Sequence, residues 1–228
     1  MKDKKIRIIK DGPYLVEGGI PLIEKIIRND GHENYYEIGR TFAVGEEYLL
    51  CSCGKSSTKP FCDGTHAAIH YNGAEQASRK NYLDQAAEYD GPELILTDQE
   101  NLCAFARFCH KRHGDVWNLT LSSDNPIHKK EAIAAAEDCP AGRLIAWNKD
   151  SKIPYLPDEE AAITIIQDPE KKCSGPIWVK GNVPLVSSDG TEYERRYQMT
   201  LCRCGESDNK PFCDAMHVSI QFDDRYSK

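Results

Sequence analysis

Apolar residues near the N-terminus fall in short runs that Gly and Pro interrupt. Such runs cover residues 6–9, 14–17 and 20–26, and a further run lies near residues 47–51. An Asn-Asp-Gly sequence at residues 29–31 lies between the third and fourth runs. Short β-rich runs separated by turn residues predict β-strands.

The C-terminal part of the chain has the same character. It predicts strands at residues 163–166, 177–180 and 193–201, with a Ser-Asp-Gly turn at residues 188–190. Neither part has enough apolar side chains to bury a core alone. Repeats with this limitation usually pack on each other, so we expect the two ends to form one pseudo-symmetric β-domain.

The segment between the two ends has a different pattern. Residues 94–96 predict a strand, and residues 144–147 predict another. Between them, Asp124 or Asn125 can cap a helix that has Pro126 at its first position. The predicted fold class is therefore α+β and rich in strands, with an inserted segment that contains the main helix.

Two stretches of the chain repeat, which supports this division. Residues 12–22 (GPYLVEGGIPL) match residues 175–185 (GPIWVKGNVPL) at an offset of 163. A cysteine motif repeats at an offset of 151, so the first copy has a 12-residue insertion. We divide the chain into a first unit (residues 1–71), a middle segment (72–152) and a second unit (153–228).

The repeated motif reads CSCGKSSTKPFCDGTH at residues 51–66 and CRCGESDNKPFCDAMH at residues 202–217. A C-x-C pair at a strand end places both side chains on one face. We expect Pro60 to start a helix, with Cys62 and His66 stacked at i and i+4. Each motif then offers two ligand pairs. The ligands are Cys51, Cys53, Cys62 and His66 in site 1, and Cys202, Cys204, Cys213 and His217 in site 2.

Spacing alone leaves two kinds of metal centre open. A four-coordinate zinc ion is one, although its paired ligands usually stand two to four residues apart and C-x-C is tight for it. A cluster with two iron atoms is the other, because it takes one ligand pair at each metal. Spacing favours the cluster.

The motif resembles the signature of the CDGSH iron–sulfur domain family, C-x-C-x2-[S/T]-x3-P-x-C-D-G-[S/A/T]-H. The first copy fits in full through its four ligands and Ser56, Pro60, Asp63, Gly64 and Thr65. The second copy keeps the ligands, Ser207, Pro211 and Asp214. It departs at Ala215 and Met216, where the family has Gly and a small residue, which concerns packing and solvent access.

This resemblance implies one [2Fe–2S] cluster at each site, with the C-x-C pair on the inner iron and the later Cys and His on the outer, exposed iron. It also implies that two such units intertwine, here within one chain as a pseudo-dimer. A single histidine ligand should give a reduction potential of roughly −300 to +100 mV, between all-cysteine and two-histidine clusters. Because a protonated imidazole cannot bind metal, the cluster should be acid-labile. Asp63 and Asp214 would belong to the cluster environment or simply stabilise the helix start.

The middle segment contains three further candidate ligands: Cys103, Cys109 and Cys139, the last followed by Pro140. The pattern C-x5-C…C-P is similar to single-cluster ferredoxins that lack the middle ligand, and Ala106 stands at that position. This resemblance implies a [3Fe–4S] cluster on three thiolates, or a [4Fe–4S] cluster with an outside ligand. We call these three cysteines the middle site.

Other interpretations of the middle cysteines stay open. They can be buried thiols, a zinc site or a vestigial ligand set. His110 beside Cys109 is a fourth ligand or a surface residue. Cys173, which belongs to no motif, is a thiol outside the sites or reaches the middle site.

Composition narrows the class of protein. Acidic residues outnumber basic ones by 36 to 29, giving a formal charge of −7. This balance argues against binding to nucleic acid. No apolar run is long enough to span a membrane, and the N-terminus lacks the apolar region of a signal peptide. We expect a cytoplasmic protein, where reducing conditions favour metal ligation by cysteine over disulfides.

No motif of enzyme chemistry is present, so we expect no enzyme. We expect instead a monomeric electron carrier that exchanges single electrons with soluble redox partner proteins. The alternatives are a redox or pH sensor, a donor of iron–sulfur clusters to apo-acceptors, and a structural zinc module for protein interactions.

Overall fold

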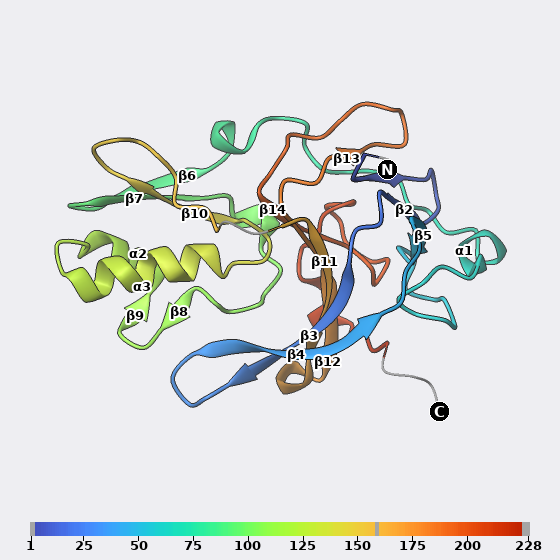
Figure 1. The fold of residues 1–228 in the computed structure, drawn as a ribbon, viewed down its shortest axis with the longest axis horizontal. Coiled ribbons are helices and arrows are strands. Elements are labelled where there is room, and N and C mark those ends of the chain that lie inside the picture. Colours follow the sequence, from blue (N-terminus) through green and yellow to red (C-terminus); the bar gives the residue numbers. More distant parts are fainter. Residues whose placement is uncertain (1–2, 158–159, 225–228) are drawn as a thin grey trace.

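Figure 1 shows the computed structural model, which describes residues 3–157 and 160–224. The fold is α+β and rich in strands. The first unit contains strands β1 (Lys5–Ile8), β2 (Tyr14–Glu17), β3 (Leu22–Asn29), β4 (Asn34–Phe42) and β5 (Glu47–Leu50), and the short helix α1 (Thr65–Ala68). The predicted strand at residues 14–17 is confirmed, and the other predicted strands of this unit are present with ends that differ by up to three residues.

The middle segment and second unit complete the chain. The middle segment contains η1 (Tyr82–Asp84), β6 (Ala87–Asp90), β7 (Leu94–Asp98), η2 (Glu100–Leu102), β8 (His110–Lys111), β9 (Gly114–Asp115), α2 (Val116–Leu121), α3 (Pro126–Glu137) and β10 (Leu144–Asn148). The second unit contains β11 (Ala162–Asp168), η3 (Pro169–Lys171), β12 (Cys173–Lys180), β13 (Leu185–Val186), β14 (Gln198–Leu201) and α4 (Met216–Ser219).

The two units exchange strands. One sheet has the order β13-β1-β2-β5, and the other has the order β14-β12-β11-β3-β4. In the first sheet, β13 of the second unit runs parallel to β1, with Leu185 opposite Ile6. In the second sheet, β3 of the first unit runs parallel to β11, with Leu22 opposite Ile163. Leu22 and Leu185 occupy equivalent positions in the repeat, so each unit contributes the same strand to the other's sheet.

A large hydrophobic core draws on strands of both sheets and of both units. Its fully buried members include Ile6, Val16 and Leu50 from the first unit and Ile163, Ile177 and Leu201 from the second. Burying a side chain of this size contributes about 1.5–3 kcal/mol. The expectation that neither end buries a core alone therefore agrees with the packing.

The 12-residue insertion of the first unit forms the long hairpin β3–β4, which passes beneath the middle segment in Figure 1. Asp30 closes its turn by accepting hydrogen bonds from the backbone N–H groups of His32 and Glu33. The hydrophobic pattern did not predict β4, because much of this strand faces solvent; Ile38 is 73% exposed.

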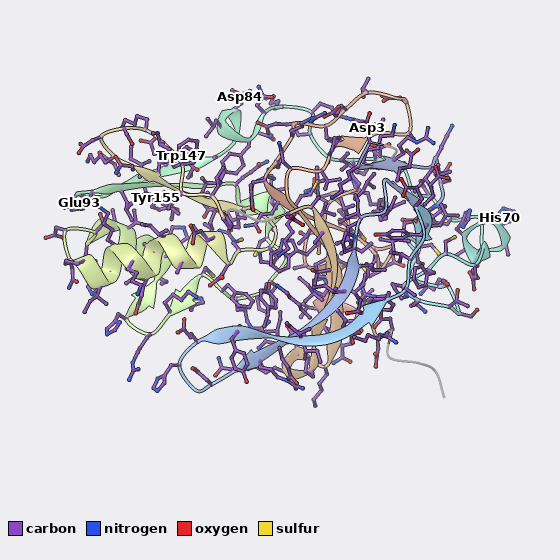
Figure 2. The ribbon with its side chains drawn as sticks, viewed as in Figure 1. Asp3, His70, Asp84, Glu93, Trp147 and Tyr155 are labelled. Carbon is purple, nitrogen blue, oxygen red and sulfur yellow. The ribbon has the colours of Figure 1, made fainter. Side chains whose placement is uncertain are left out.

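The middle segment forms its own antiparallel sheet, β10-β7-β6, with α2 and α3 packed on it. The predicted helix is confirmed: Asn125 caps α3 by accepting a hydrogen bond of 2.9 Å from the N–H of Ile127. Figure 2 labels Trp147 and Tyr155 at this end of the molecule and His70, beside α1, at the other end. Within the described residues, no helix combines the length and apolar character needed to cross a bilayer.

Candidate metal centres

The side chains of site 1 come together as two pairs. The sulfur atoms of Cys51 and Cys53 lie 3.7 Å apart directly after β5. The sulfur of Cys62 lies 3.4 Å from Nδ1 of His66. Backbone hydrogen bonds join the two halves, because the N–H of Cys51 donates to Pro60 and the N–H of Cys62 donates to Leu49.

Site 2 repeats this geometry. The sulfur atoms of Cys202 and Cys204 are 3.6 Å apart, and the sulfur of Cys213 lies 3.4 Å from Nδ1 of His217. The N–H of Cys202 donates to Pro211. The sequence-predicted ligands of each motif are therefore neighbours in the fold.

The predicted helical stacking of Cys62 and His66 is wrong. Pro60 lies before α1 and follows a cis peptide bond, and α1 begins only at Thr65. Cys62 lies outside the helix because its backbone N–H bonds to Leu49. Gly64 turns the chain into α1 with a φ of 88°, and this turn brings Cys62 and His66 together. In site 2 the equivalent residue is Ala215, with a φ of 71°.

Asp63 and Asp214 fix the loops around the sites. The carboxylate of Asp63 accepts hydrogen bonds from the backbone N–H groups of Ser57 and Thr65. That of Asp214 accepts from the N–H groups of Asp208 and Met216. The hydroxyl of Thr65 also bonds to Asp63 and, with the other donors, lowers the pKa of this carboxyl. These contacts favour a structural role over direct contact with a cluster.

Burial controls the protonation of the ligands. It raises the pKa of Cys53 to about 11 and also raises that of Cys62. Burial, together with the charge of Arg203, lowers the pKa of His217 to about 4. The imidazole of His217 is therefore neutral at pH 7, the form that binds metal. Metal binding must release the thiol protons.

The candidate ligands of each site are arranged in pairs, which bears on the metal group that they fit. In the part of the chain that the structure describes, no three or more His, Cys, Asp or Glu side chains are arranged to hold a single metal ion. The ligands instead form separate pairs, joined by contacts of 3.4–3.7 Å. A [2Fe–2S] cluster takes one pair at each iron, so the donors fit this group better than one tetrahedral zinc ion.

The three cysteines of the middle site line one hollow of the surface. Cys103, Cys109 and Cys139 surround it together with Ala106 and Arg143. The 103–109 loop curves around the hollow. Its bend depends on Phe105 and Arg107, which adopt left-handed φ values of 56° and 64°.

Burial and polar donors act in opposite directions on these thiols, and burial raises the pKa of Cys109 to about 11. Although burial raises the pKa of Cys139, the backbone N–H groups of Leu144, Arg143 and Ala141 all donate to its sulfur. The guanidinium of Arg143 bonds both to Asp98 and to the sulfur of Cys103. Amide and cationic donors of this kind stabilise anionic sulfur, so the hollow offers partners to thiolates formed on metal binding, although burial favours the neutral thiols of Cys109 and Cys139 without a metal.

The β3–β4 hairpin packs against the 103–109 loop. The side chain of Asn34 donates to the backbone oxygen of Ala106 at 3.2 Å, and the ring of Tyr36 stacks on Phe108 at 4.3 Å. From the second unit, Asp168 pairs with Arg107 at 2.6 Å. The insertion noticed in the sequence is thus a support for the middle site, a role that sequence spacing did not reveal.

Two further candidate ligands lie elsewhere. His110 is exposed in β8 and does not line the hollow. Cys173 is fully buried at the start of β12 and does not line it either. The described geometry brings neither residue to the middle site.

Two protein families match parts of the chain. Residues 11–67 and 174–218 match the family described as iron-binding zinc finger CDGSH type. Residues 89–149 match the family described as divergent 4Fe-4S mono-cluster. The chain is an iron–sulfur protein. More particularly, it is a tandem CDGSH protein with a divergent mono-cluster segment between its two CDGSH units.

The candidate ligands of sites 1 and 2 lie inside the two CDGSH matches, and the middle cysteines lie inside the mono-cluster match. Searches of curated proteins and of solved structures found no significant match.

Proposed function

We propose that sites 1 and 2 each hold one [2Fe–2S] cluster and that the middle site holds a third cluster, [3Fe–4S] or [4Fe–4S]. The protein then transfers single electrons between soluble partner proteins. One observation carries this proposal: Cys139 of the middle site packs against a buried cluster of side chains that contains Cys213 of site 2. Two neighbouring clusters of different type would allow an electron to pass from one to the other over a short distance.

We also propose that the two CDGSH units form an intramolecular pseudo-dimer. The reciprocal strand exchange supports this arrangement. So do two equivalent close approaches: Gly54 lies against the backbone of Cys204, and Gly205 lies against the backbone of Cys53. The inner ligand pairs of the two sites therefore face each other across the interface.

A second candidate function is that of a redox or pH sensor, or of a protein that donates its labile cluster to an apo-acceptor. The partial exposure of Cys62 and His66 favours it, because an exposed histidine ligand can be lost or replaced. We rank it below electron transfer, since a cluster donor gains nothing from a middle site packed against site 2. We propose no catalytic activity, and we place the protein in the cytoplasm on its cysteine content.

Reductive titration tests the electron-transfer proposal. With each cluster accepting one electron, the anaerobic protein should take up about three electrons per chain. The Cys139→Ser variant should take up about two, because it lacks a thiolate of the middle site. The exposed His110→Ala variant serves as the control and should match the wild type.

Electron paramagnetic resonance during the titration identifies which signal disappears. Loss of a signal other than that of a histidine-ligated [2Fe–2S] cluster supports the proposal. An uptake of about two electrons by both the wild type and Cys139→Ser would contradict it.

A further inference from the structure

The two CDGSH sites share one geometry but differ in access to solvent. At site 1, Cys62 and His66 are both partly exposed. At site 2, Cys213 and His217 retain only 3% and 4% of their exposure. These are the outer ligands, the pair that the motif places farthest from the other unit. Something in this chain therefore covers site 2 and leaves site 1 open.

The middle segment supplies the first cover. Cys213 packs against Ala104 and Ala141, and Cys139 contacts the same group. Ala104 follows Cys103, and Ala141 comes two residues after Cys139. The backbone that holds the middle cysteines is thus the same backbone that closes site 2.

A second difference between the repeats lies on the inner side of site 2, although the inner cysteines are buried to a similar degree at both sites. In site 1, the hydroxyl of Ser52 donates to the backbone oxygen of Gly12 at 2.6 Å. At the equivalent place in site 2, Nε of Arg203 donates to the backbone oxygen of Gly175, also at 2.6 Å. Arg203 then reaches further and pairs with Asp224, and both side chains are at least 97% buried.

The partners of this ion pair also have equivalents. Asp224 aligns with Gly73 at the offset of 151, and Phe222 aligns with Tyr71. Phe222 packs against Cys202 and Cys204, and the guanidinium of Arg203 lies over its ring. Where the first unit has Ser52 and Gly73, the second unit therefore has an ion pair that holds the segment around Phe222 against the inner ligands.

The two sites are in contact through their inner pairs. The hydroxyl of Tyr14, in the first unit, donates to the backbone oxygen of Cys202 at 2.8 Å. Gly54 and Gly205 lie against the backbones of Cys204 and Cys53. The order along the molecule is site 1, site 2, middle site. Figure 1 agrees, because α1 beside site 1 lies at the end of the molecule opposite α2 and α3.

We propose that the two CDGSH sites have different roles: site 1 is the port at which electrons are exchanged with a partner protein, and site 2 is a sealed relay between site 1 and the middle site. The inference rests on the proposed function. An electron that enters at site 1 leaves a one-electron donor protein oxidised. An electron that leaves the middle site reduces an acceptor by one electron, and no bond is made or broken.

Chelator challenge of the holoprotein tests this division. The protein is reduced and mixed at neutral pH with excess ferrous-iron chelator, and the [2Fe–2S] absorbance and released iron are followed. We expect two phases, with site 1 losing its cluster at least about tenfold faster than site 2, the change that about 1.4 kcal/mol of extra protection gives.

Ligand variants assign the phases. His66→Cys should change the spectrum of the fast phase, and His217→Cys should change that of the slow phase, because an all-cysteine cluster absorbs differently. The Arg203→Ser/Asp224→Gly variant installs the residues of site 1 in site 2. It should accelerate the slow phase and leave the fast phase unchanged.

The outcomes separate the inference from the proposed function. Protein isolated without iron and sulfide would overturn the proposed function. Protein with both [2Fe–2S] clusters that loses them in one phase, or loses site 2 first, would overturn only the division of roles. If the double variant fails to retain clusters, the two histidine variants decide the question alone.

Discussion

Replacing Gly54 by Ala is expected to abolish cluster binding at both CDGSH sites. A Cβ atom on Gly54 would lie 2.7 Å from the carbonyl carbon of Cys204 and closer still to its oxygen. These are backbone atoms of a site 2 ligand, so relief of the overlap must displace that ligand. Gly54 also has a φ of 71°, which adds strain for any other residue. We expect a loss of about 3 kcal/mol or more in stability.

The measurement is the cluster absorbance of purified protein, followed by its thermal unfolding. Gly64→Ala is the matched control, because Gly64 also has a positive φ, 88°, but nothing lies within 4 Å of its Cβ position. Ala215 occupies the equivalent position in the second unit at a φ of 71°. This control should keep both clusters. If Gly54→Ala behaves like Gly64→Ala, the two units do not meet as described.

The Asp224→Asn variant is expected to lose about 3–5 kcal/mol of stability, because it leaves the charge of Arg203 buried without a counterion. The arginine cannot escape by losing its proton. The carboxylate of Asp224 also accepts hydrogen bonds from Ser174 at 2.6 Å and Gln167 at 2.9 Å. Asn is nearly the same size as Asp, so the change removes charge without creating a cavity.

The pKa of Asp224 defines where this test applies. Burial by itself would raise the pKa, but the charge of Arg203 and the hydrogen bonds from Arg203, Ser174 and Gln167 together outweigh it and lower the pKa from 3.8 to about 2. A carboxyl whose pKa is lowered on folding stabilises the protein above its unfolded pKa, and this contribution disappears as the pH falls through about 2. At pH 7 the full effect is present.

Unfolding by denaturant at pH 7 gives the change in stability. The matched control is Glu37→Gln, which removes the carboxylate partner of Arg28 at a distance of 2.5 Å. That pair is exposed, so its loss should cost less than about 1 kcal/mol. Equal effects of the two substitutions would show that the pair of Arg203 and Asp224 does not seal the second unit.

The sequence predicted which candidate ligands lie together, because residues within one short motif are held close by the local backbone. Each motif spans sixteen residues, and the repeat itself identifies equivalent positions. The cap and start of α3 were predicted for the same reason: Asn125 and Pro126 act on adjacent backbone. The position of Cys62 was missed, because it depends on backbone pairing with Leu49, which the motif does not contain.

The sealing of site 2 could not be predicted from a motif. It depends on Ala104 and Ala141, which pack against Cys213 in the fold. Nothing in the sequence around these two alanines indicates that contact. One signal was available, however. The repeat reads C-S-C in one copy and C-R-C in the other. An arginine between two buried ligands indicates that its charge has a buried partner. Its partner Asp224 comes from residues beyond the motif.

Iron and acid-labile sulfide per chain, with zinc determined alongside on anaerobically purified protein, test the central claim most directly. Two [2Fe–2S] clusters and a cluster in the middle site predict about seven or eight irons with a comparable amount of sulfide. About four irons and four sulfides would contradict the third cluster and leave the middle cysteines structural. Zinc without sulfide would contradict the whole account.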